Sequence, residues 1–433
     1  MKSFNLKFPA SGYENRILSY PVILFLFLGQ IIFYWFYFKR AIFLIDSPTY
    51  VSASDLVLQG IPDVFRTPIY PFFIGVFRII FGNSWAIALV FFQSILFLLS
   101  GGVFYILSSK IVKNRKYVFW LTAFYLLYPG FVIYCFYIMT EAIAISGMTL
   151  FAYFIFRMLQ NPKSLWNVLW MNLCLMFLIF LRPVFIFLLP IIAIIFIYQI
   201  VKLKPKFIYG FCGLIGLIFI GFCLFLYQKD ITKRYGIHSI SCVTVINNYF
   251  SFRYLGIIDP SLAPSPELKE LVAKTFEKRY DDDVVLALNE VNEMSKQRGF
   301  AEIEVYEKEL AKKYPYDLAQ SILLRWRDQA SLYPALPILP FDWKFRTLEI
   351  LIPSTGTYFF CLLLYGIILI IQLKRYGSIP FFQFILLLIC LGLYIVNAVG
   401  APTDFSRLNV PAIPLAMILL GNFCASLKLK RIV

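Results

Sequence analysis

Residues 165–201 read LWNVLWMNLCLMFLIFLRPVFIFLLPIIAIIFIYQIV, and this stretch decides the fold. It contains two apolar runs, 165–181 and 184–201, that are separated only by Arg182-Pro183. An α-helix needs about 20 apolar residues to cross the hydrocarbon core of a bilayer. Two such runs with one charged residue between them are typical of a helical hairpin in a membrane protein.

The same pattern recurs along the whole chain of 433 residues, which is 60% hydrophobic and 19% aromatic. This composition excludes an ordinary soluble domain. The first run has no small-residue cleavage site and is too long for the core of a signal peptide, so we expect it to be an anchor. We predict ten membrane-spanning helices, at 18–38, 85–108, 117–138, 142–158, 165–181, 184–201, 207–227, 347–372, 379–398 and 408–424.

The net charge of +16 does not indicate a nucleic-acid partner. The excess lysines and arginines fall in short loops beside the predicted spans, where the positive-inside rule places them on the cytoplasmic side. That bias would reverse if the short apolar run 68–82 also crossed the membrane. We therefore expect 68–82 to be a helix in the outer interface, opened by Pro68 and Pro71, and both chain termini to be cytoplasmic.

The predicted fold is an all-α polytopic membrane protein in three parts. Residues 1–227 form a transmembrane module whose first outer loop spans 39–84, residues 228–345 form an extracytoplasmic helical loop, and residues 346–433 supply the C-terminal transmembrane helices. Within the long loop, amphipathic spacing predicts helices over 266–279 and within 284–327.

Carboxylates are scarce in the rest of the sequence. Only seven lie outside this long loop. Three of them, Asp46, Glu141 and Asp404, lie at the ends of predicted spans, and the topology places all three at the outer face. Arg66, Arg182 and Arg407 face the same side. Ionisable groups at the edge of a bilayer are candidates for a functional site.

These residues lie in four groups. The first is Asp46-Ser-Pro-Thr-Tyr50 with Ala53 and Gly60, followed by Arg66-Thr-Pro-Ile-Tyr70-Pro71; the others are Thr140-Glu141, Arg182-Pro183, and Asp404 to Pro411 around Arg407. In order and sidedness they resemble the integral-membrane glycosyltransferases of the GT-C class. The nearest relatives by this resemblance are the protein O-mannosyltransferases and the aminoarabinose transferases that modify lipid A. The resemblance covers about the first 200 residues well and the C-terminal part more loosely.

The resemblance implies a reaction in which a sugar passes from a polyprenyl-phosphate donor to an acceptor hydroxyl on a glycan, a lipid or a protein. Asp46 would be the general base, and Glu141 would orient the acceptor, tune Asp46 or help to bind a metal. The donor phosphate and substrate would be bound by Arg66, Arg182, Arg407, Tyr50 and Tyr70. A one-step displacement would invert the anomeric centre.

Each of these residues also has a purely structural interpretation. Asp46 and Glu141 could cap helices, the arginines could extend to the interface, and the tyrosines could belong to an aromatic belt. Two weaker site candidates are Asp404 and His238, the only histidine. A divalent cation, Mg²⁺ or Mn²⁺, is the candidate cofactor. The loop departs from some members of the class in one respect: Asp46 is followed by Ser47 and not by a second acid.

Two other functions compete with the glycosyltransferase interpretation. An O-antigen polymerase or ligase also has many spans and a large outer loop, although the informative residues here come before that loop. A lipid or sugar transporter would need charged groups deep within its spans or related halves. We expect the site to face the periplasm or exterior from a bacterial inner membrane, with the lipid bilayer as a partner and no nucleic acid.

Overall fold

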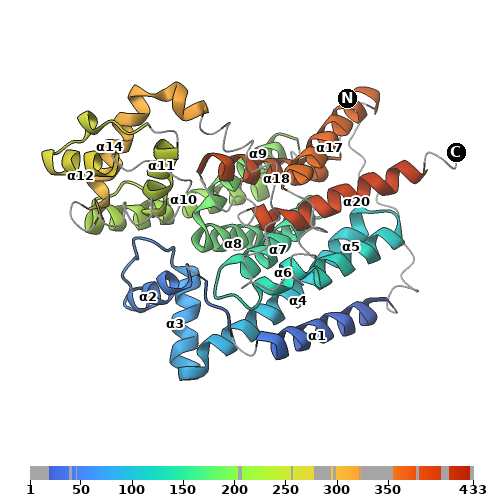
Figure 1. Cartoon of the computed structure of the whole chain (residues 1–433). Coiled ribbons are helices and arrows are strands. Elements are labelled where there is room, and N and C mark those ends of the chain that lie inside the picture. Colours follow the sequence, from blue (N-terminus) through green and yellow to red (C-terminus); the bar gives the residue numbers. More distant parts are fainter. Residues whose placement is uncertain are drawn as a thin grey trace.

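A computed structural model describes residues 19–38, 41–44, 46–202, 207–254, 257–276, 294–295, 299–320, 323, 355–376, 380–400 and 409–429. Long apolar helices make up most of this part of the chain (Figure 1). Their bounds are α1 Ser19–Phe38, α4 Trp85–Ile111, α5 Arg115–Leu127, α7 Glu141–Gln160, α8 Leu165–Leu181, α9 Leu188–Lys202, α10 Phe207–Tyr235, α17 Thr355–Tyr376, α18 Phe381–Gly400 and α20 Ile413–Leu429.

Within the described residues, five helices are long and apolar enough to cross a membrane. They are Ile69–Ile111, Arg115–Tyr134, Glu141–Gln160, Pro183–Val201 and Ile208–Tyr235. Shorter apolar helices lie at Pro21–Phe36, Leu165–Leu181, Leu362–Ile371, Phe381–Asn397 and Val410–Ala425. These segments overlap all ten predicted spans, and the first of them also includes nearly all of the run 68–82. Their helical and apolar character confirms the all-α polytopic membrane class.

The run 68–82 forms a helix of its own, α3 (Ile69–Phe81), which packs against α2 (Ser47–Leu58). A short 3₁₀ turn, η1 (Gly82–Ser84), separates α3 from α4, and Figure 1 shows the chain turning sharply there. Gly82 has φ of +51°, a conformation that a residue with a side chain adopts only at a cost. Arg78 Nη1 lies 2.6 Å from Asp55 Oδ1 and ties α3 to α2.

The predicted span 117–138 is wrong in its second half. Helix α5 ends at Leu127, and a short helix α6 (Pro129–Tyr134) follows. Pro129 has no N–H and forces the residue before it out of the helical region, so Tyr128 is extended with ψ of 117°. The predicted helix is therefore interrupted at Tyr128 and Pro129.

After α6 the backbone pairs with the segment that precedes Asp46. Ile42 donates its N–H to Phe136 O at 2.9 Å, and Ile138 donates to Ile42 O at 3.0 Å. This isolated parallel bridge joins Ile42 and Tyr137. It places the chain just before Glu141 beside the chain just before Asp46, two positions that are far apart in sequence.

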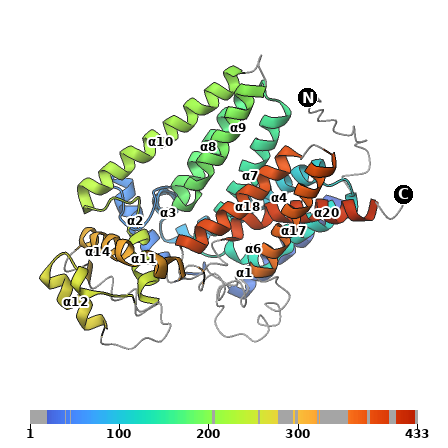
Figure 2. The ribbon, with the colours of Figure 1, turned by 90° about the horizontal axis from the view of Figure 1, so that it is seen from above.

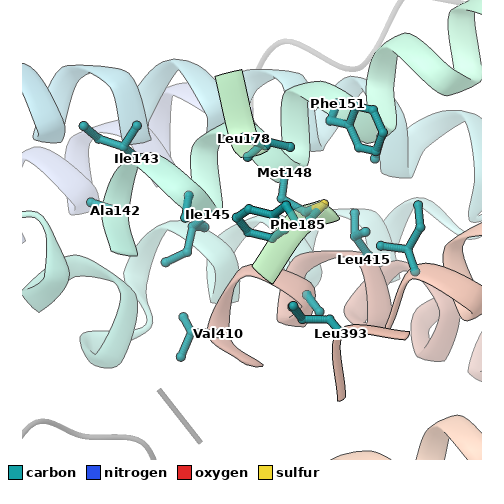
Figure 3. Close-up of a cluster of buried hydrophobic side chains, with 14 of the residues drawn as sticks. Ala142, Ile143, Ile145, Met148, Phe151, Leu178, Phe185, Leu393, Val410 and Leu415 are labelled. Carbon is teal, nitrogen blue, oxygen red and sulfur yellow. The ribbon is translucent and has the colours of Figure 1, made fainter. Parts of the chain in front are cut away.

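Helix α7 lies in the middle of the hydrophobic core. Figure 3 shows its side chains, including Met148 and Phe151, beside Leu178 of α8, Phe185 of η2 (Pro183–Phe187) and Leu415 of α20. All five are fully buried. A second 3₁₀ segment, η5 (Val410–Ala412), also packs on α7. Because interiors are close-packed, this arrangement fixes the position of Glu141, the first residue of α7.

Helix α10 continues to Tyr235, two turns beyond the predicted end at 227. It leads into a helical unit that we call the cap, made of α11 (Val243–Tyr254), η4 (Pro260–Leu262), α12 (Pro266–Phe276) and α14 (Phe300–Lys313). Figure 2 shows these helices together at one end of the molecule, away from α20. Helix α12 falls within the predicted 266–279, whereas α14 begins only after Gly299, whose φ is +76°. Residues 277–293 lie outside the described part.

The cap has its own hydrophobic cluster, which includes Tyr249, Leu268 and Tyr306. Val64 and Phe65, from the loop between α2 and α3, pack against this cluster. The loop that carries Arg66 and the cap therefore lie on the same face of the helical bundle.

Candidate functional site

Asp46 and Arg66 form an ion pair at the face covered by the cap. Arg66 Nη2 donates to Asp46 Oδ1 at 2.9 Å. Asp46 directly precedes α2, but its side chain makes no capping hydrogen bond to that helix. The capping interpretation therefore does not account for Asp46, and its carboxylate faces the arginine instead.

Arg66 is held by further groups from the first turn of α2. Its Nε donates to Thr49 Oγ1 at 2.7 Å, and its Nη1 donates to Tyr50 OH at 3.3 Å. The guanidinium carbon also lies 4.2 Å from the centre of the Tyr50 ring, a cation–π distance. The side chains of Arg66 and Asp46 are 15% and 27% exposed. The pair is thus ordered and still within reach of a ligand.

Glu141 and Arg182 form a second acid–arginine pair, 3.6 Å apart, with side chains that are only 1% and 11% exposed. Glu141 opens α7 and Arg182 follows the last residue of α8. Thr140 makes no side-chain capping bond. Removing one partner from a buried ion pair leaves the other without its counter-charge and is strongly destabilising, so each of these two residues depends on the other in the interior.

The two pairs come together through their neighbours. Thr67, next to Arg66, donates its hydroxyl to the carbonyl of Leu181, next to Arg182, at 3.1 Å. The rings of Tyr50 and Tyr70 meet edge to face with centroids 5.1 Å apart. Six of the predicted site residues therefore belong to one connected cluster: Asp46, Tyr50, Arg66, Tyr70, Glu141 and Arg182.

Gln93 of α4 is a structural residue of this cluster that sequence reasoning missed. It accepts a hydrogen bond from Tyr70 OH at 3.0 Å and donates to the carbonyls of Cys135 and Tyr137, both at 3.0 Å. The side chain is fully buried. The sequence feature that could have indicated Gln93 is its position as an amide side chain within the apolar run 85–108. A polar group inside a membrane span needs hydrogen-bonding partners.

Asp63 is a second residue that was missed. Its Oδ1 accepts the backbone N–H groups of Phe65 at 2.8 Å and of Arg66 at 2.7 Å. Burial raises the pKa of the Asp63 carboxyl, and these two hydrogen bonds oppose that rise. The sequence feature that could have indicated Asp63 is the Pro62-Asp63 pair just before Arg66. A Pro-Asp pair is typical of a turn in which the aspartate side chain accepts backbone N–H groups.

The remaining candidates do not join the cluster in the described residues. His238 is exposed at the edge of the cap, where its backbone N–H donates to Glu304 Oε2 at 2.8 Å. This agrees with a structural role in the loop. Asp404 and Arg407 lie outside the described residues. Just beyond them, Asn409 accepts a buried hydrogen bond from Asn397 at 3.1 Å, which joins the chain before α20 to α18.

Among the residues that the structure describes, no three His, Cys, Asp or Glu side chains are grouped so that they could share a metal ion. The clustered acids are each matched with an arginine. The cluster thus contains two guanidinium groups that could bind an anion and two carboxylates that could accept a hydrogen bond from a hydroxyl group.

No protein-family profile matches the chain, and no curated protein matches it. Among solved structures, the chain is similar to ArnT from Cupriavidus metallidurans. The apo structure matches with a TM-score of 0.37 and 13% identity, over 93% of this chain and 77% of that one. The structure bound to undecaprenyl phosphate matches with a TM-score of 0.37 and 14% identity, over 94% of this chain and 76% of that one. At these scores, a functional assignment has to come from the site itself.

Proposed function

We propose that this protein is an inverting glycosyltransferase that moves a sugar from a polyprenyl-phosphate donor to an acceptor hydroxyl at the extracytoplasmic face of the membrane. The observation that carries this proposal is the partly exposed Asp46–Arg66 pair beside the buried Glu141–Arg182 pair. The choice of a polyprenyl-phosphate donor comes from the resemblance of the sequence motifs to the GT-C class.

In this proposal Arg66 exchanges one anion for another. Its guanidinium has the planar fork that suits both carboxylate and phosphate oxygens. In the described state it is bonded to Asp46, Thr49 and Tyr50. A donor phosphate arriving at the cluster would compete for the same N–H groups and release the Asp46 carboxylate. Binding of the donor would thereby turn a paired acid into an available base.

The released Asp46 carboxylate would take the proton of the acceptor hydroxyl as that oxygen attacks the anomeric carbon. The new carbon–oxygen bond forms as the bond from that carbon to the phosphate oxygen breaks. The bonding electron pair leaves with the phosphate, whose growing charge is stabilised by the arginines. No acid is needed to protonate this leaving group, in contrast to a glycosidase, which has to activate a poor one.

Glu141 and Arg182 would provide a rigid second side of the site. Both are buried and positioned by α7 and by the end of α8. Arg182 would supply positive charge to the phosphate, and Glu141 would hold that arginine in place. The cap, which lies over the same face, is the part of the chain that would meet the acceptor glycan, lipid or protein. In a bacterial inner membrane this face would be periplasmic.

Mass spectrometry of lipids that copurify with the protein tests this proposal. We expect a polyprenyl phosphate or its sugar adduct with the wild-type protein and strong depletion with Arg66→Ala. Arg78→Ala is the matched control, because Arg78 pairs with Asp55 outside the cluster. A polyprenyl diphosphate carrying an oligosaccharide would favour the polymerase or ligase alternative. Retention of the sugar phosphate by Arg66→Ala would contradict the proposed role of Arg66.

A further inference from the structure

The backbone of the segment that carries Arg66 is hydrogen-bonded to the part of the chain that enters the cap. Tyr235 OH donates to Pro62 O at 3.0 Å, and the N–H of Cys242 donates to Val64 O at 2.8 Å. Ser241 Oγ donates to Phe65 O at 2.7 Å. Three carbonyls within four residues are thus taken by donors that lie about 180 positions later in the sequence.

The amide groups of the same segment are held from within by Asp63. Its Oδ1 accepts from the N–H groups of Phe65 and Arg66, and its side chain is buried. A carboxylate that accepts two consecutive N–H groups closes a tight turn. The turn sets the direction in which the Arg66 side chain leaves the backbone.

Side-chain packing fixes the segment further. The ring of Phe65 meets the ring of Phe300 of α14 edge to face, with centroids 5.6 Å apart. Val64 also packs against the cap cluster. The backbone at 62–66 therefore cannot shift without disturbing contacts in the cap.

This arrangement matters because arginine has a long, flexible side chain. The side chain loses rotamer entropy when its guanidinium is held in one place. A small misplacement of a binding group has a large effect on the rate of a reaction. The bonds to Thr49, Tyr50 and Asp46 require the Arg66 backbone to be in the correct position first.

We propose that Asp63 and Ser241 are positioning residues that hold Arg66 in the site, and that through Ser241 the cap determines whether the site is assembled. The proposal rests on the proposed function in one respect, which is that Arg66 is the residue that binds the donor phosphate. Asp63 and Ser241 act through the backbone at Phe65 and Arg66 and not on the reacting atoms.

The first test needs no ligand. The thermal midpoint Tm is measured for Asp46→Ala, Arg66→Ala and the double variant, each in the wild-type, Asp63→Ala and Ser241→Ala backgrounds. In the wild-type background the double variant should lose less than the sum of the two single losses, because both remove one interaction. In the Asp63→Ala and Ser241→Ala backgrounds the losses should become additive.

Two control backgrounds separate positioning from general destabilisation. Asp63→Asn keeps an acceptor oxygen for the two N–H groups and should restore the non-additivity. Ser251→Ala removes a buried hydroxyl from the cap whose bond, to Asn247 O, lies within α11, so it should leave the non-additivity intact. Non-additivity that persists in both Asp63→Ala and Ser241→Ala, or that is absent from the wild type, overturns the proposal. If Asp63→Ala does not fold, Ser241→Ala alone decides.

The second test uses undecaprenyl phosphate as the probe. Loss of a charge-assisted hydrogen bond weakens binding by about tenfold or more, and we expect Asp63→Ala to weaken probe binding on that scale. Adding Arg66→Ala to Asp63→Ala should cause little further loss. If wild-type protein does not bind the probe while the Tm cycles behave as expected, the proposed function fails and the positioning role stands. If binding depends on Arg66 but not on Asp63 or Ser241, the positioning role fails and the proposed function stands.

Discussion

At the scale of single residues, the central feature is the contrast between two acid–arginine pairs. Asp46 and Arg66 keep partial contact with solvent, whereas Glu141 and Arg182 are almost fully enclosed. An ion pair at the edge of the site can exchange partners when a ligand arrives. A buried pair cannot lose a partner without a large penalty. The first pair is therefore suited to a changing role and the second to a fixed one.

The change Asp46→Asn tests the proposed base. Asparagine can still accept a hydrogen bond from Arg66 but cannot take a proton, so we expect kcat to fall about 100-fold or more with little change in expression or Tm. The measurement is transfer from a polyprenyl-phosphate sugar, followed by mass spectrometry of the product. Asp55→Asn is the matched control on the other end of α2 and should keep full activity. Wild-type transfer by Asp46→Asn would refute the role of Asp46 as base.

The changes Glu141→Gln and Arg182→Met test the buried pair. Each single variant should lose about 3 kcal/mol of stability, because it leaves the other residue buried without its counter-charge. The double variant should lose clearly less than the sum, measured by thermal or denaturant unfolding in detergent. The exposed pair of Asp55 and Arg78 gives the comparison, since surface pairs couple by about 1 kcal/mol or less. Additive losses at Glu141 and Arg182 would show that the two do not interact.

At this scale the sequence singled out charged residues that the structure brings together, but it did not predict their contacts. The scarcity of acids selected Asp46 and Glu141, and outer sidedness together with the motif resemblance selected Arg66 and Arg182. The pairing of Asp46 with Arg66 was not predicted, because sidedness places residues on a face but does not say which ones touch. Gln93 was not predicted because an uncharged amide in an apolar run carries a weaker signal than a carboxylate.

At the scale of elements, proline and glycine explain where prediction and structure differ. Apolar runs located the spans well, and 165–181 is the exact extent of α8. The run 117–138 was predicted as one helix, although Pro129 stops it and the chain becomes extended. The end of α10 was predicted too early, because the polar turns after residue 227 continue the helix beyond the apolar run. Periodicity does not distinguish a helix that leaves the membrane from a loop.

Helix α14 of the cap contains a buried acid whose titration should be visible. Burial raises the pKa of the Glu307 carboxyl well above its ordinary value of 4.5. The folded cap therefore holds this proton more tightly than the unfolded chain does. The contribution of Glu307 to stability is most favourable below pH 4.5 and declines as pH rises from there towards the higher folded pKa.

Glu307→Gln should remove this decline. We expect the variant cap to be more protected than the wild type at pH 8 and to differ little at pH 4.5, as measured by hydrogen exchange of α14. Glu309→Gln is the matched control, because Glu309 lies on the same helix in an exposed pair with Lys312. Lower protection of Glu307→Gln than of wild type at pH 8 would mean that the ionised carboxylate has a stabilising partner in the fold.

At the scale of the whole molecule, one face brings together segments that are far apart in sequence. The loop after α2, the start of α7, the end of α8 and the cap all meet there. The charge bias of the short loops predicted this shared face. The hydrogen bonds between residues 235–242, which lead into the cap, and the carbonyls of residues 62–65 could not be predicted, because the positions of both segments depend on the complete fold.

The orientation of that face is tested by labelling. A cysteine at position 113, in the loop between α4 and α5, should react with an impermeant thiol reagent only from the cytoplasm. A cysteine at the exposed Lys308 of the cap should react only from the outside. The native thiols are replaced first, so that each variant has a single reactive site. The opposite pattern would reverse the predicted topology and place the site in the cytoplasm.

The most direct measurement of the central claim is a cryo-EM map of the protein with undecaprenyl phosphate bound. The proposed function predicts phosphate density within hydrogen-bonding distance of the Arg66 guanidinium and on the side facing Arg182, with the Asp46 carboxylate no longer bonded to Arg66. Phosphate density away from both arginines, or an Asp46–Arg66 pair that remains closed with the lipid bound, would contradict it.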